Sequence, residues 1–285
     1  KLYMDGSPYT GGAAFSEPYL NTDLTLNRIG LKKNHRGSTN LTEDSLLTTL
    51  TYYHRNKFQI AIHAQGEVAI QGILDAFTKI LYKYPRTNHR HRIEHNALIT
   101  KEQIAQAEKL GITLSFFIDH IYYYGDKLEY IVGPERAERF MPIQSAISAG
   151  HNATIHTDNP ATPIDPFRAI STAVMRKTKD DNVILGKNEQ ISVYDALKSI
   201  TINAAWQLFE DQSRGSITIG KSADLVILSH NPLEINQEEI KNLSVISTWI
   251  DGKQVNHSIY TWKNFKLILF IIYNYINTSI KEWFM

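Results

Sequence analysis

The chain contains no cysteine, and its charges nearly cancel. Its 285 residues include 30 Lys and Arg against 29 Asp and Glu, a formal net charge of +1. Without cysteine there can be no disulfide framework, thiolate metal site or cysteine nucleophile, so any bound metal must be held by nitrogen and oxygen ligands. The basic residues are dispersed and form no block, so we expect no nucleic-acid partner.

Long apolar runs are also missing. The most apolar stretch, residues 265–276, is interrupted by Asn and Lys and is too short to span a membrane, which takes about 20 predominantly apolar residues. We therefore expect no membrane partner and read residues 257–285 as an atypical C-terminal extension, with a partner-binding amphipathic helix as the alternative. No signal peptide opens the chain, but residue 1 is not an initiator methionine. A cytoplasmic location is the working expectation, and export stays open.

Apolar strand-like segments alternate with helical segments over most of the chain. After a Gly- and Pro-rich loop at residues 6–22, apolar runs at 58–64, 91–98, 112–118 and 152–158 are separated by amphipathic stretches of helical period. This alternation predicts an α/β fold with a parallel sheet, of the kind found in (β/α) barrels. Short strands with Gly and Asp turns follow at residues 213–256 and predict a small β-subdomain.

Candidate metal ligands lie where the predicted strands end. His63, His95 and Asp158 each come at or just beyond the end of an apolar run. The carboxyl edge of a barrel is where catalytic groups are assembled. A lone histidine at a strand end is more often structural, but two from successive strands, about 4.8 Å apart, can share one metal ion. Strand alternation places Glu94 and His95 on opposite faces, so only one of them is expected to look inward.

A second group of polar residues lies further along the same region. His156 and Asp158 alternate on one strand and share a face, so the carboxylate could bind metal and take a proton from a water whose pKa is lowered to roughly 7. An ordinary turn at Asp158 is the alternative. His120 and Asp126 lie in an aromatic stretch that suits a pocket wall, where they could contact substrate or simply pack beneath a loop. The other histidines are expected to be surface or structural: His35, His54, His89, His91, His151, His230 and His257.

Six segments, in this order and spacing, resemble the YtcJ-like branch of the metal-dependent amidohydrolase superfamily (amidohydrolase family 3). They are KLYMDGSPYTGGAA, AIHAQGE, RIEHNAL, FFIDHIYYYGD, HTDNPATPIDP and GSITIGKSADLVIL. The resemblance covers residues 1–255 and implies the C-terminal half of a (β/α)8 TIM-like barrel. On this reading residues 1–212 form the barrel portion, and residues 213–256 contribute strands to a composite β-sandwich.

The resemblance also implies roles for individual residues. His63 and His95 match metal ligands, and Asp158 matches the aspartate that binds metal and activates the hydrolytic water. Lys1 aligns with a lysine that is carboxylated in binuclear members and bridges two ions. The implied cofactor is zinc or a similar divalent metal, as one or two ions. His120 and His156 match pocket residues that contact substrate.

One family feature is absent from the sequence. Members carry a His-x-His pair on the first barrel strand, whereas the only such pattern here, His89 to His91, is predicted in a polar loop. We therefore expect a chain truncated at its N-terminus, from a hydrolase that cleaves C–N bonds of small amide-type, non-peptide molecules with a metal-activated water. The alternative is a non-catalytic remnant, or a regulatory or interaction protein. A metal-free barrel enzyme is disfavoured because no Gly-rich phosphate loop is present. Homo-oligomer formation stays open.

Overall fold

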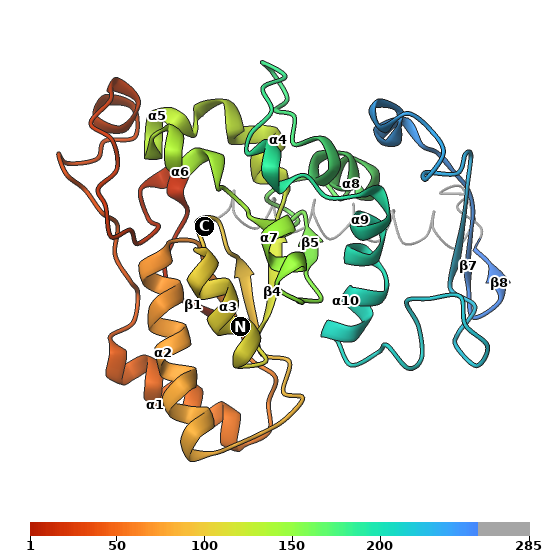
Figure 1. The fold of residues 1–285 in the computed structure, drawn as a ribbon, viewed down its shortest axis with the longest axis horizontal. Coiled ribbons are helices and arrows are strands. Elements are labelled where there is room, and N and C mark those ends of the chain that lie inside the picture. The colour runs from red at the N-terminus through yellow and green to blue at the C-terminus, as the bar shows by residue number, and fades with distance from the viewer. Residues whose placement is uncertain (256–285) are drawn as a thin grey trace, which may run out of the picture.

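The computed structural model describes residues 1–255, which are organised around a five-stranded parallel sheet (Figure 1). Its spatial order is the chain order, β1-β2-β3-β4-β5, and every neighbouring pair is parallel. The strands are β1 (Leu2–Tyr3), β2 (Ala61–Ala64), β3 (Arg92–His95), β4 (Thr113–Phe117) and β5 (Thr154–His156). The predicted α/β class with a parallel sheet is confirmed, while closure into a barrel stays a prediction.

Ten α-helices connect or flank the strands within the described residues. They are α1 (Glu43–Arg55), α2 (Glu67–Lys83), α3 (Lys101–Lys109), α4 (Asp119–Tyr124), α5 (Glu129–Val132), α6 (Pro134–Glu138), α7 (Ile143–Ser148), α8 (Pro166–Met175), α9 (Val193–Ile200) and α10 (Ile202–Gln207). The predicted caps are present. The Thr42 hydroxyl accepts from the Ser45 N–H at the start of α1, and Thr100 forms a reciprocal capping box with Gln103 at α3.

The sheet core is apolar on neighbouring strands at the same level. Ile62, Ile93 and Leu114 are in register across β2, β3 and β4, and all three are fully buried. Helix α2 packs its buried stripe, which includes Ile70 and Ile73, into the same core. Near-continuous apolar strands are typical of parallel sheets covered on both faces, and this arrangement leaves the strand ends to carry polar chemistry.

A three-stranded antiparallel sheet follows the parallel one. It contains β6 (Leu225–Leu228), β7 (Val245–Ile250) and β8 (Lys253–Gln254). Figure 1 shows it at the opposite end of the molecule from α1 and α2. The predicted strands within 213–256 are therefore present, whereas their place in a sandwich and their status as a separate domain stay predictions. The extension at 257–285 lies outside the described residues.

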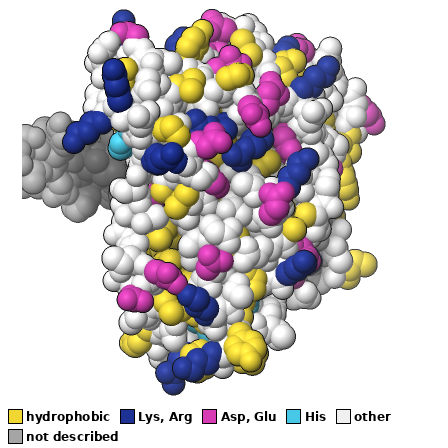
Figure 2. Space-filling model, turned by 60° about the vertical axis from the view of Figure 1, so that its left-hand side comes forward, with side chains coloured by type: hydrophobic (Ala, Val, Ile, Leu, Met, Phe, Trp, Pro, Cys, Tyr) yellow, Lys and Arg dark blue, Asp and Glu magenta, His cyan; other side chains and the backbone are white. Residues whose placement is uncertain are grey.

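The outer surface carries mixed charge. In Figure 2 the Lys and Arg side chains are interspersed with Asp and Glu over the face drawn, and no patch of one sign stands out. None of the helices in the described part of the chain is long and apolar enough to cross a membrane.

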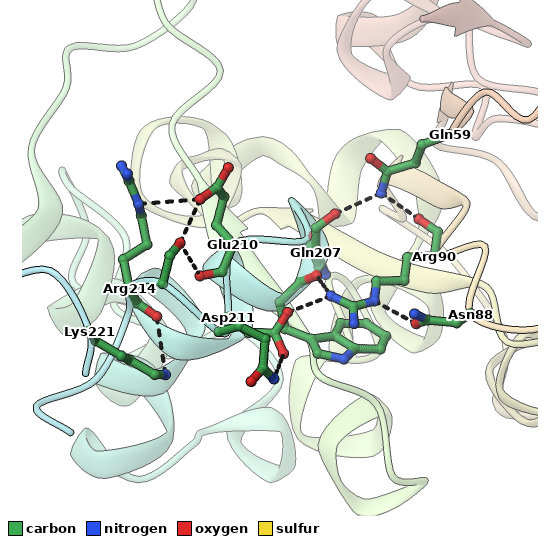
Figure 3. Close-up of polar contacts among 11 residues, drawn as sticks. Gln59, Asn88, Arg90, Gln207, Glu210, Asp211, Arg214 and Lys221 are labelled. Carbon is green, nitrogen blue, oxygen red and sulfur yellow. Dashed lines mark hydrogen bonds and ion pairs between the residues drawn. The ribbon is translucent and has the colours of Figure 1, made fainter. Parts of the chain in front are cut away.

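Arg90 links the amino end of the sheet to the segment after α10 (Figure 3). Its guanidinium donates to the Asp211 carboxylate at 2.7 Å and lies over the rings of Trp206 and Phe209, 4.5 and 4.4 Å from their centres. The Gln59 amide donates to the carbonyls of Arg90 and Gln207 nearby. The loop before β3 was expected to be polar, and its residue Arg90 is nevertheless buried, because its guanidinium finds partners in the distant α10 segment.

Three buried histidines form a hydrogen-bonded chain at this same amino end. The Ile60 N–H donates to His91 Nδ1, so His91 Nε2 carries the hydrogen and donates to His54 Nδ1 at 2.9 Å. His54 Nε2 in turn donates to the Tyr84 carbonyl. His89 Nδ1 accepts from the His91 N–H, and its Nε2 donates to the carbonyl of Leu110. These rings are structural, as expected, and all six ring nitrogens are used.

The side-chain amide of Gln207 joins β4 to β5 at the amino end. Its nitrogen donates to the Thr113 hydroxyl at 2.7 Å and its oxygen accepts from the Thr154 hydroxyl at 3.0 Å. All three side chains are buried. The amino end of the sheet is therefore held by saturated polar contacts.

Candidate metal centre

Three histidines gather at the carboxyl edge of the parallel sheet. His63 lies near the end of β2, His95 is the last residue of β3 and His156 is the last residue of β5. The ring centres of His63 and His95 are 4.2 Å apart, and those of His95 and His156 are 5.1 Å apart. The strand-end histidines predicted from sequence are thus brought together, and His156 joins them.

His95 reaches His63 through a break in the strand alternation. Cross-strand register pairs His63 with Glu94 and Ala64 with His95, so regular alternation would turn His95 away from His63. His95 instead has a φ of 77°, which breaks the alternation at the strand end and brings its ring beside His63. The Glu94 charge also acts on the site, because it raises the pKa of His63 and His156 against the lowering effects of their burial. The expectation that only one of Glu94 and His95 faces inward stays a prediction.

The geometry of the cluster suits a divalent ion. His95, His156 and Asp158 can each offer a ligand atom, and these atoms lie within 4.8 Å of one another. His63 Nε2, His95 Nδ1 and His156 Nε2 are buried and have no hydrogen-bond partner among residues 1–255. Buried polar atoms without partners are rare and costly, and a neutral imidazole nitrogen is a common metal ligand. The donor set therefore fits a nitrogen- and oxygen-bound metal.

Burial keeps the clustered imidazoles neutral. It lowers the pKa of His63 to about 4, with the nearby Lys1 charge acting in the same direction. Burial likewise lowers the pKa of His95, which is further depressed by the neighbouring His156 and His63, and it lowers that of His156. The rings hold the ligating form at neutral pH without having to lose a proton.

Lys1 and Asp158 are two further predicted site residues whose charges act on the histidines. The Lys1 ammonium is 5.5 Å from the centre of the Tyr3 ring. Its positive charge lowers the pKa of all three histidines, although burial is the larger cause. Carboxylation of Lys1 stays a prediction. Asp158 lies two residues beyond β5 with a φ of 50°. Its negative charge partly restores the pKa of His63 and His156.

Asp5 is a site residue that the sequence reasoning missed. It is buried, and its carboxylate accepts from the backbone N–H groups of Ala14, Gln65 and Gly66 at 2.8–3.0 Å. Its Oδ1 lies 3.8 Å from His63 Nε2. Burial raises the pKa of Asp5 to about 6 despite the three N–H donors. The available signal was its position two residues after β1, the same strand-end rule that had selected Asp158 after β5.

A second polar cluster lies beside the histidines and includes the predicted substrate contact His120. The His120 ring is 4.0 Å from that of Phe117, which itself stacks 5.4 Å from His156. The Tyr9 ring meets His120 edge-on at 5.2 Å, and this tyrosine was not singled out from sequence.

Three atoms of this second cluster are buried with no hydrogen-bond partner in the described chain: Tyr9 Oη, His120 Nδ1 and Asp126 Oδ1. Burial lowers the pKa of His120 to about 3 and raises that of Tyr9, with Tyr124 and Asp126 adding to the second effect. His120 therefore lies next to the histidine cluster, whereas Asp126 is near enough to Tyr9 for its charge to raise the pKa of that tyrosine.

Comparison with known proteins gives a consistent picture. The sequence profile of the Amidohydrolase family matches residues 1–256. The protein LONG AFTER FAR-RED 3 of Arabidopsis thaliana is 31% identical over 90% of this chain and 42% of its own length. The amidohydrolase YtcJ of Bacillus subtilis is 28% identical over 90% of this chain and 46% of its own. An N-substituted formamide deformylase of Arthrobacter pascens is 28% identical over 68% of this chain and 35% of its own.

Solved structures show the same likeness. A metal-dependent hydrolase from Pyrococcus horikoshii is 25% identical with a TM-score of 0.69, covering 83% of this chain and 45% of that one. Its counterpart from Pyrococcus furiosus is 26% identical with a TM-score of 0.67, covering 82% and 44%. The chain spans less than half the length of the curated relatives it matches. A family profile that matches all of the described residues shows that the chain belongs to the amidohydrolase family.

Proposed function

We propose that the chain carries part of the active site of a metal-dependent hydrolase that cleaves C–N bonds, other than peptide bonds, in small amide-type molecules. The observation that carries the proposal is the set of three buried, unpartnered imidazole nitrogens gathered with Asp158 at the carboxyl edge of the sheet. The deformylase relative supports an amide-type substrate, because its name states that it acts on N-substituted formamides.

The ligands in this proposal are His63, His95 and Asp158. His156 is a further candidate ligand, because its ring centre lies 5.1 Å from that of His95. Lys1 is the candidate for a carboxylated lysine that bridges a second ion. We propose that the site binds one or two zinc ions, because histidine nitrogens and carboxylate oxygens are common zinc ligands. When bound, the ion would polarise the substrate carbonyl and lower the pKa of a water beside it.

The chain's own groups supply the proton transfers and the binding surface. Asp158 has an ionisable carboxylate with no hydrogen-bond partner among the described residues, so it is free to accept a proton from the attacking water and pass it to the leaving nitrogen. The Phe117 ring packs against His95 and His156, and the Tyr9 ring packs against His120, so aromatic rings line this part of the site. His120 and Asp126 offer unpartnered polar atoms to a substrate.

A non-catalytic role is the second candidate. It is favoured by one observation: the chain covers only 42% of the length of its 31% identical relative. In this second candidate the chain keeps the amidohydrolase scaffold without a working centre and serves as a remnant, or as a regulatory or interaction protein. The division into residues 1–212, 213–256 and 257–285 stays a prediction.

Metal content and amide hydrolysis of the 285-residue chain test the two candidates. We expect the purified, dialysed chain to retain stoichiometric zinc and to release formate from N-benzylformamide. Asp158→Asn should lower hydrolysis by roughly 100-fold or more, in the range seen when a general base is removed. Asp75→Asn, on the exposed face of α2, is the matched control. Full activity of Asp158→Asn would remove the mechanism, and a folded chain without zinc would favour the non-catalytic role.

A further inference from the structure

Asp119 is a fully buried carboxylate at the start of α4, immediately beyond β4. Its Oδ2 accepts from the Thr162 hydroxyl at 2.7 Å and from Arg168 Nη2 at 2.8 Å. Arg168 Nε lies 3.4 Å from the other oxygen, so the guanidinium approaches the carboxylate as a fork. Asp119 thus fixes two side chains that come more than 40 residues later in the chain.

Those two side chains hold the loop between β5 and α8. The Thr162 hydroxyl also lies within hydrogen-bond distance of the Thr157 carbonyl, where the loop begins. Arg168 Nη2 donates to the carbonyl of Pro163 at 2.6 Å, and Arg168 Nη1 pairs with Asp165 at 3.3 Å, where the loop ends. Asp119 therefore contacts Thr162 and Arg168 directly, and these two side chains in turn contact the loop at Thr157, Pro163 and Asp165.

Asp158 lies inside this loop and depends on it for its position. Its carboxylate makes no hydrogen bond within residues 1–255, whereas its backbone carbonyl accepts from the Ala161 N–H at 2.8 Å. With no side-chain partner, the place of the carboxylate next to His95 and His156 is determined by the path of the backbone. That path is maintained by Thr162 and Arg168.

We infer that Asp119, Thr162 and Arg168 are positioning residues that hold the Asp158 carboxylate at the metal cluster. The inference rests on the proposed function for the role of Asp158, but not for the network itself. Outer partners of this kind orient metal ligands, and their loss typically costs about 10- to 100-fold in metal affinity. None of the three residues contacts the reacting atoms, so their effect reaches the metal only through the loop.

The test compares two threonines that are equally buried, each with 2% of its surface exposed. Thr162→Val removes the hydroxyl bound to Asp119, and Thr162→Ser keeps it. Thr113→Val, the matched control, removes a hydroxyl that accepts from Gln207 at the amino end of the sheet.

Zinc affinity of the full chain is measured by competition with a chelator. We expect Thr162→Val and Arg168→Lys to weaken zinc binding about 10-fold or more, with Thr162→Ser and Thr113→Val within about twofold of the parent chain. Equal affinity in Thr162→Val and the parent would overturn the inference.

A second measurement separates this inference from the proposed function. Backbone amide exchange is followed in residues 157–165 and, for comparison, in β3 and β4. Thr162→Val and Arg168→Lys should speed exchange in the loop alone, whether or not zinc is present. If the parent chain binds no zinc but loop exchange rises in the variants, the metal proposal fails and the network stands. If loop exchange is unchanged, or rises equally in Thr113→Val, the network does not hold the loop.

Discussion

The imidazoles of His63 and His95 lie 4.2 Å apart between ring centres, although the strand register pairs neither residue with the other. The contact exists because the backbone of His95 enters the left-handed region at the end of β3. A non-glycine residue in this conformation is uncommon and carries a conformational cost of order 1–3 kcal/mol. The surrounding packing maintains that backbone and presents an unpartnered nitrogen.

Replacing His95 by Ala should weaken zinc binding by at least about 100-fold, beyond the effect typical of an outer partner, because a direct ligand is lost. His151→Gln is the control, since His151 is a buried histidine whose Nε2 bonds only to the Ile104 carbonyl, away from the cluster. Chelator competition measures both. Retained zinc affinity in His95→Ala would show that the cluster does not bind the metal.

Acid should destabilise the chain through the histidines at the amino end. Burial lowers the pKa of His89 to about 4, against an ordinary value near 6.5 in the unfolded chain. Between these two values the unfolded state binds more protons, so the free energy of unfolding falls as the pH falls, by about 1.4 kcal/mol per pH unit for such a group.

Urea unfolding at pH 7 and pH 5 tests this linkage. The parent chain should lose about 2 kcal/mol more than His89→Gln over that interval, because the variant has no such group to titrate. The difference between the two chains cancels the contribution of Asp5, whose raised pKa acts in the opposite direction. Parallel pH dependence in the two chains would contradict the linkage.

Two arginines drawn in Figure 3 should differ in their importance to stability. Arg90 is buried, paired with Asp211 and in contact with two aromatic rings, so Arg90→Ala should cost about 2–4 kcal/mol. Arg214 is half-exposed and pairs with Glu210 at 3.5 Å, so Arg214→Ala should change stability by no more than about 0.5 kcal/mol. Thermal or urea unfolding checks both, and equal costs would show that the Arg90 contacts do not stabilise the fold.

Tyr9→Phe should leave stability unchanged or raise it by up to about 1 kcal/mol, because it removes a buried hydroxyl that has no partner among the described residues. Tyr19→Phe is the matched control: its hydroxyl donates to the Ala13 carbonyl at 2.9 Å, so its loss should cost about 1–2 kcal/mol. Urea unfolding compares the two. A large loss in Tyr9→Phe would mean that its hydroxyl has a structural partner.

Much of the fold and part of the site can be predicted from local sequence patterns. Alternating periodicity is a property of short segments, so the order of strands and helices, the Thr42 and Thr100 caps, and the strand-end positions of His63 and His95 follow from it. Parallel strands bring their carboxyl ends to one edge of the sheet, so a cluster of the strand-end histidines can be predicted from the sequence.

The remaining features depend on contacts between distant segments or on single backbone angles. The role of Asp5 becomes visible only when Gln65 and Gly66 return to it 60 residues later. The burial of Arg90 requires Trp206, and the orientation of His95 requires a φ that no residue pattern specifies. Tyr9 was missed because a tyrosine in a Gly-rich loop is ordinarily a surface residue.

Gln207 and the three linked histidines lie at the opposite end of the strands from the unpartnered imidazoles. Each end can therefore accumulate substitutions under a different selective pressure. We expect substitutions at the amino end to affect the stability of the fold, and substitutions at the carboxyl edge to affect the chemistry of the site. Such separation would let a lineage change side chains that line the site while inheriting a scaffold whose integrity is secured elsewhere.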